Sequence, residues 1–173
     1  MTALDGPAYR ALFTSFTRTA WRWEAQPTYT MPAEQSGLAR FLAGEPEPPD
    51  HNADWHQAIR AWTATGKNIA RVRAVTPPLT DYQRYQLAWG IPGNVRAGED
   101  VRVLDLSVHP EVLVPQRDFW LLDSTTVVHL DFDDDGRLLG RELVEEPDLD
   151  LYHQWRTAAT TRAVPVRQWN ARP

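Results

Sequence analysis

The chain has 173 residues, of which 42% are hydrophobic and eight are tryptophan, so it can bury one sizeable core. The absence of cysteine excludes disulfides, a thiolate nucleophile and a cysteine-ligated zinc site. A formal net charge of -5 leaves no basic excess to neutralise phosphates, so direct nucleic-acid binding is not expected. We therefore predict one domain over residues 1–173, with a loose C-terminal tail at 164–173.

The apolar segments of the chain predict a cytoplasmic protein without membrane contact. No apolar run approaches the roughly 18 residues that a membrane span requires. Asp5 stands where a secretory signal peptide would carry a cationic start followed by an apolar stretch.

The first half of the chain predicts three helices and two strands. Apolar residues recur at helical spacing over 5–17, 32–43 and 52–65, and the last of these is the clearest helix. The segment 20–25, AWRWEA, reads as a strand with its tryptophans on one face and its charged side chains on the other. A second strand, NIARVRAV, is predicted at 68–75.

The second half is predicted to be richer in strands. Thr80 and Gln83 form a capping box that starts a helix over 80–89, and the following segment, IPGNVRAGED, reads as a loop. Strands are expected at 101–106, 119–123, 126–132 and 137–143. A last helix is expected over 147–162, with Leu151 and Trp155 facing the core.

Short turns between successive strands favour pairing of neighbours in the sequence. We therefore predict an α+β fold, in which a mainly antiparallel sheet of about five or six strands packs against three to five helices.

The acidic run near residue 135 matches the spacing of an EF-hand calcium loop. The matching positions are Asp131, Asp133, Asp135, Gly136 and Glu142. An EF-hand needs a helix on each side, whereas the segment VVHLDF before the run is β-branched and aromatic. We predict a β-hairpin whose turn is DDDG, and calcium binding stays a weaker alternative.

The strand at 68–75 carries two arginines that project from the same face, Arg71 and Arg73. In one interpretation this face is solvated or salt-bridged, and the candidate partners are Asp81, Glu99 and Asp123. In the other interpretation the arginines clamp an anion or a carboxylate. The aromatic and hydroxyl neighbours of that pocket would be Tyr82, Tyr85 and Trp120.

The sequence offers little support for catalysis. Glu99 is a weak general-base candidate, because adjacent Asp100 would point to the opposite face of a strand. The segment TATGKN lacks most of a phosphate loop, the histidines are scattered, and no serine stands in a nucleophile elbow. We expect no resident metal and no cofactor.

Three segments together carry a resemblance to a known family: RVRAVTPPLTDYQRYQLAW, AGEDVRVL and DFWLLDSTTVVHLDFDDDGRLLGRELVEEP. Their order resembles an actinobacterial family of domains of unknown function, small acidic proteins found near Xre-type helix-turn-helix regulators. The resemblance implies no reaction. It highlights Arg71, Arg73, Asp81, Tyr82, Glu99, Asp118, Phe119, Trp120 and Asp123.

Two functions from different classes remain open. The leading hypothesis is a non-catalytic accessory or regulatory protein that acts through protein-protein contact, with a helix-turn-helix regulator as a possible partner. The alternative is a small-molecule enzyme or an anion-binding domain of specialised metabolism. It requires six side chains to converge on one pocket: Arg71, Arg73, Tyr82, Tyr85, Glu99 and Trp120.

Overall fold

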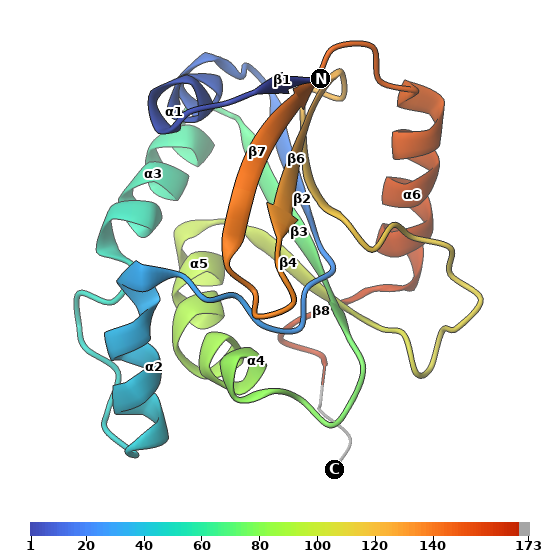
Figure 1. The fold of residues 1–173 in the computed structure, drawn as a ribbon. Helices are drawn as coiled ribbons and strands as arrows, with labels where there is room; N and C mark the ends of the chain where they lie inside the picture. Colours follow the sequence, from blue (N-terminus) through green and yellow to red (C-terminus); the bar gives the residue numbers. More distant parts are fainter. Residues whose placement is uncertain (170–173) are drawn as a thin grey trace.

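The fold is seen in a computed structural model that describes residues 1–169, in which eight strands form one sheet (Figure 1). The strands are β1 (Thr2–Ala3), β2 (Thr19–Glu24), β3 (Asn68–Val75), β4 (Asp100–Asp105), β5 (Asp118–Leu122), β6 (Thr126–Phe132), β7 (Leu138–Val144) and β8 (Val164–Pro165). Their order in the sheet is β1-β7-β6-β5-β2-β3-β4-β8. In the predicted loose tail, β8 pairs with β4, and residues 170–173 lie outside the described residues.

The helices lie between and after these strands. They are α1 (Gly6–Ser15), α2 (Gln35–Leu42), α3 (Ala53–Ala64), α4 (Asp81–Tyr85), α5 (Ile91–Ala97) and α6 (Leu149–Arg162), with a 3₁₀ turn, η1 (Pro32–Glu34), and a π-helical turn, η2 (Gln86–Gly90). Among residues 1–169, none of these helices combines the length and the apolar character needed to cross a membrane.

The α+β class is confirmed, but the sheet is mixed and larger than predicted. β2, β3 and β4 run parallel to one another, whereas the other neighbours in the sheet are antiparallel. Parallel neighbours need long crossover connections, and segments 25–67 and 76–99 supply them with helices. The two outermost strands have two residues each, which is too short to produce an alternating pattern.

The two faces of the sheet carry different layers. α6 covers one face, and α1, α3 and α5 gather on the other (Figure 1). Trp21, Trp23 and Phe119 form a core under α6, so the tryptophans of the WRWE segment point that way. The charged side chains between them therefore point to the α1 and α3 side, as their alternation along the strand predicts.

One side chain of α6 lies differently from the prediction. Leu151 is 36% exposed, whereas Tyr152 is buried and Trp155 packs beside it. The buried face of this helix therefore contains Tyr152 and Trp155, so Trp155 faces the core as predicted and Leu151 does not.

The segment predicted as a loop at 91–100 is mostly helix. α4, η2 and α5 follow one another without a break, after the predicted capping box between Thr80 and Gln83. The prediction was wrong because Gly90 and Pro92 read as helix breakers, yet the backbone stays helical through both: the π-helical turn η2 ends at Gly90, and Pro92 lies in the turn that follows it, the first of α5. The helix ends at Gly98, whose φ of 118° favours glycine.

The acidic run forms the predicted β-hairpin. β6 and β7 pair antiparallel, and Gly136 has a φ of 77° in the turn between them. Arg117 binds Asp131 and Glu142 at 2.5 and 2.7 Å, while Arg137 pairs with Asp135 in the turn. The EF-hand spacing thus lies on two strands and the turn between them, and residues 1–169 contain no group of three or more histidine or acidic side chains that could hold a metal ion.

The tip of this hairpin is tied to the segment that follows β2. The backbone N–H of Thr30 donates to the carbonyl of Gly136 at 2.8 Å, and its hydroxyl donates to the carbonyl of Asp135 at 2.6 Å. A Cβ on Gly136 would collide with the carbonyl oxygen of Thr28, so this approach requires glycine. These contacts hold Tyr29 against Phe132, at 4.9 Å between ring centroids.

Candidate ligand-binding site

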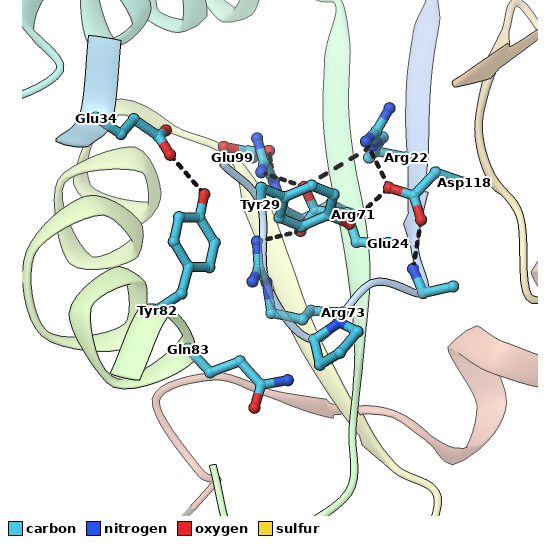
Figure 2. A network of polar contacts seen from close by, with 12 residues as sticks. Arg22, Glu24, Tyr29, Glu34, Arg71, Arg73, Tyr82, Gln83, Glu99 and Asp118 are labelled. Atoms are coloured by element: carbon cyan, nitrogen blue, oxygen red, sulfur yellow. Dashed lines mark hydrogen bonds and ion pairs between the residues drawn. The ribbon is translucent and has the colours of Figure 1, made fainter. Parts of the chain in front are cut away.

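The centre of the site is a group of charged side chains on β2 and β3. The register of these parallel strands places Arg22 beside Arg71 and Glu24 beside Arg73, all on the face opposite the α6 core. Figure 2 shows Glu24 in the middle of the three guanidinium groups. Its carboxylate lies 2.8 Å from Arg73 Nη2, 3.0 Å from Arg71 Nη1 and 3.8 Å from Arg22 Nε.

Two further carboxylates complete the charge balance of this group. Arg71 Nε donates to Glu99 at 2.5 Å, and Arg22 Nη2 donates to Asp118 at 2.7 Å. Asp118 also accepts hydrogen bonds from the Tyr29 hydroxyl at 2.5 Å and from the backbone N–H of Ala25 at 2.8 Å. We call the three arginines and three carboxylates (Arg22, Arg71, Arg73, Glu24, Glu99 and Asp118) the ionic floor.

The pKa values within the ionic floor follow from burial and pairing. Burial opposes ionisation of Glu24, but Arg73, Arg71 and Arg22 outweigh it and lower the pKa of this carboxyl to about 2. Burial dominates at Asp118 and raises its pKa, and burial raises the pKa of the Tyr29 hydroxyl well above its usual value. Glu24 is therefore a permanent anion at neutral pH.

The low pKa of Glu24 predicts a defined loss of stability in acid. A carboxyl whose pKa is about 2 when folded and 4.5 when unfolded stabilises the fold fully above pH 4.5 and loses that contribution as the pH falls towards 2. The raised pKa of Asp118 acts in the opposite direction, so the effect of Glu24 must be isolated.

Comparison of the wild type with Glu24→Gln isolates the contribution of the Glu24 carboxylate to stability. The difference in their free energies of unfolding is expected to shrink by roughly 3 kcal/mol between pH 7 and pH 2. Urea titrations followed by tryptophan fluorescence measure this difference, and a value independent of pH would contradict the assigned pKa.

The ionic floor leaves several of its hydrogen-bond donors unused. Arg73 is only 1% exposed, yet its Nε and Nη1 have no hydrogen-bond partner among the described residues, and neither does Arg22 Nη1. The Arg73 guanidinium lies between two rings, 5.5 Å from the centroid of Tyr29 and 5.8 Å from that of Tyr82. Charge is balanced here, but hydrogen bonding is incomplete, so these donors are available to a bound polar group or to ordered water.

A cavity of about 390 Å³ lies over the ionic floor. This volume is within the range of small-molecule sites. Its walls are mostly aromatic and come from α1, α3, η1 and the hairpin as well as from the sheet. The aromatic side chains that line it are Tyr9, Phe13, Tyr29, Trp55, Trp62, Tyr82, Trp120 and Phe132.

Four of the six side chains expected in one pocket do line this cavity: Arg71, Arg73, Tyr82 and Trp120. Glu99 lies behind Arg71 with its side chain fully buried. Tyr85 belongs to the neighbouring core, where its ring packs on Phe41 and Trp89. The buried position of Glu99 leaves no room for a substrate to reach its carboxylate, while Asp100 is exposed and pairs with Arg102.

Two other candidates lie away from the cavity. Asp81 pairs with Arg84 on the surface of α4. Asp123 accepts hydrogen bonds from the backbone N–H groups of Thr17, Arg18 and Thr19 at 2.7, 2.7 and 3.0 Å. Burial would raise the pKa of the Asp123 carboxyl, but these N–H groups lower it to about 2. Its role is to fix the entry of the chain into β2.

Asp123→Asn is expected to lower the free energy of unfolding by about 1–3 kcal/mol, because an amide replaces a carboxylate that accepts several hydrogen bonds. Asparagine tolerates the φ of 50° at this position, so backbone strain does not add to the effect. Urea unfolding measures the loss, and binding of any ligand in the cavity is expected to be unchanged. No loss of stability would show that these bonds contribute nothing.

Comparison with known proteins adds the family of the chain. Residues 7–171 match the model of the family described as Domain of unknown function (DUF6879). The chain belongs to this family. Among curated proteins, no similar sequence is found. The DUF6879 match spans β2, β3 and β5, the strands that carry Arg22, Glu24, Arg71, Arg73 and Asp118 of the ionic floor.

Several residues of the site in this DUF6879 chain escaped the sequence prediction. Arg22 and Glu24 were not named as site residues, although the alternation in WRWE placed them opposite the tryptophans, on the charged face of the strand. Asp118 was highlighted only by the family resemblance. The helix residues Tyr9, Phe13, Trp55 and Trp62 gave no signal, because an aromatic side chain at helical spacing reads as core.

Proposed function

We propose that this protein binds a small organic molecule in the cavity above the ionic floor. The observation that carries the proposal is the combination of a cavity of about 390 Å³, mainly aromatic walls and a charged base with unused donors. Binding sites for small molecules typically combine apolar walls with a few placed polar groups. Three tryptophans, Trp55, Trp62 and Trp120, supply much of that wall.

Binding suits the site better than catalysis does. Glu24 is the ionic-floor carboxylate that lines the cavity, and although burial opposes its ionisation, pairing with Arg73, Arg71 and Arg22 lowers its pKa to about 2 and makes it a weak base. A general base must reach the proton that it removes, and Glu99 is shielded by Arg71. These observations favour a receptor that recognises its ligand without changing it.

The neutral fluorescent probe N-phenyl-1-naphthylamine tests this proposal. Its emission is expected to rise on mixing with the protein, with energy transfer from the wall tryptophans. Leu138→Phe, which adds volume at a lining position on β7, is expected to weaken binding by about tenfold or more. Leu139→Phe is the matched control, because Leu139 is 70% exposed. Equal binding by both variants, or none by the wild type, would contradict the proposal.

The accessory or regulatory role in the cytoplasm is our second proposal. The net charge of -5 supports it, because an acidic protein can compete with DNA for a basic partner. The partner expected from the family resemblance is a helix-turn-helix regulator. Purified regulator and protein mixed at 50 and 500 mM salt are expected to associate only at the lower salt, and no association at either salt would contradict this role.

A further inference from the structure

The arginines around the cavity fall into two groups. Arg22, Arg71 and Arg73 are each paired with a carboxylate of the ionic floor. Arg10 and Arg141 also line the cavity, and neither forms an ion pair with a described residue. Among the described residues that line the cavity, the arginines without a paired carboxylate are thus Arg10 on α1 and Arg141 on β7. The sequence had suggested Arg71 and Arg73 on β3 as the residues that bind an anion.

The position of Arg141 makes this charge available inside the cavity. Arg141 stands opposite Leu130 in the sheet, and Leu130 lines the same cavity. Its guanidinium lies 4.6 Å from the ring centroid of Tyr9, and its Nε is buried without a hydrogen-bond partner among the described residues. Arg10 follows Tyr9 on α1, and both residues line the cavity.

The charge balance around the whole cavity also favours an anion. Five arginines and two glutamates line it, and Glu99 and Asp118 lie behind the lining, so five cations face four carboxylates. The second lining glutamate, Glu34, accepts a hydrogen bond from the Tyr82 hydroxyl at 2.6 Å. The cavity therefore carries a local net positive charge, although the chain as a whole has a net charge of -5. This local charge attracts an anion.

We infer that the ligand is a compact organic anion whose acidic group pairs with Arg141 and Arg10 while its ring system lies against the tryptophan walls. This inference rests on the cavity being a binding site, as proposed above. Carboxylate, sulfonate and phosphate groups all present the oxygens that a guanidinium binds. A ring system suits the site because aromatic side chains form most of the walls, and stacked aromatic pairs add to the energy of burial.

Two probes with the same ring body test the charge of the ligand. 8-Anilinonaphthalene-1-sulfonate carries a sulfonate that N-phenyl-1-naphthylamine lacks, so the ratio of their dissociation constants reports the contribution of the acidic group. The sulfonate probe is expected to bind the wild type about tenfold more tightly. Sodium sulfate at millimolar concentration is expected not to displace it, because the ring body is needed.

Substitution of single arginines shows which residues bind the acidic group of the probe. Arg141→Gln is expected to weaken the sulfonate probe by about tenfold and to leave the neutral probe within about twofold. Arg10→Gln, at an exposed position, is expected to act in the same direction by about threefold and serves if Arg141→Gln does not fold. The matched control is Arg102→Gln, on β4 away from the cavity, which should change neither affinity.

The outcomes separate this inference from the proposed function. If the neutral probe binds at least as tightly as the sulfonate probe, or if Arg141→Gln and Arg10→Gln leave the sulfonate probe unchanged, the cavity stands as a binding site and the anion inference is wrong. If Leu138→Phe affects neither probe, the bound probes lie elsewhere and both are wrong. The inference is supported if Arg141→Gln and Arg10→Gln weaken the binding of the sulfonate probe but not that of the neutral probe.

Discussion

Replacement of Glu24 by glutamine is expected to lower the free energy of unfolding by about 3–5 kcal/mol at pH 7. Glutamine keeps the shape of the side chain and removes its charge. Arg22, Arg71 and Arg73 would then share two carboxylates in a buried setting, and the nearest partner of Arg73 would be neutral. Breaking a buried ion pair from one side is costly because the remaining charge stays out of water.

The control for this measurement is Asp100→Asn. Asp100 pairs with Arg102 at 3.1 Å, but its side chain is 45% exposed, so the expected loss is below about 1 kcal/mol. Both variants can be followed by urea titration with tryptophan fluorescence. If Glu24→Gln lost no more than Asp100→Asn, the three arginines would be solvated, and the ionic floor would not be a closed network.

Phe119→Ala is expected to lower the free energy of unfolding by about 3–5 kcal/mol through the other face of the sheet. Phe119 lies on a central strand and is 1% exposed. Its ring centroid is 5.1 Å from that of Tyr152 on α6 and 5.6 Å from that of Trp21 on β2. Truncation leaves a void between the sheet and α6, and the side chains around it lose contacts that water does not replace.

Leu113→Ala is a suitable control for this truncation, because Leu113 is 82% exposed and its loss should cost less than about 0.5 kcal/mol. Guanidinium or urea unfolding of both variants gives the comparison. A similar, small loss in both would indicate that α6 does not depend on Phe119 for its attachment to the sheet.

The sequence predicted most elements of this fold because their patterns are local. The capping box at Thr80, the alternation in WRWE and the turn before Gly136 each depend on a few neighbouring residues. Strand direction depends instead on where a crossover returns. The parallel pairing of β2, β3 and β4 therefore escaped a prediction based on the short turns between later strands.

The site was predicted in part for the same physical reason. Alternation placed Arg71 and Arg73 on one face of a strand, and the structure adds Arg22 and Glu24 beside them. Which carboxylates would compensate them depends on tertiary packing, and so Asp81 and Asp123 were offered as partners alongside Glu99. The cavity walls from α1 and α3 directly precede β2 and β3 in the chain, but no local pattern shows that these helices fold back over the charged face of the sheet.

A crystal structure of the protein purified from its native host would test the central claim, the binding of a small organic ligand in the cavity, most directly. We expect electron density for a ring-bearing molecule between the tryptophan walls, with an acidic group directed at Arg141. Ordered water alone in the cavity, or collapse of Trp55 and Trp62 onto the ionic floor, would contradict the account.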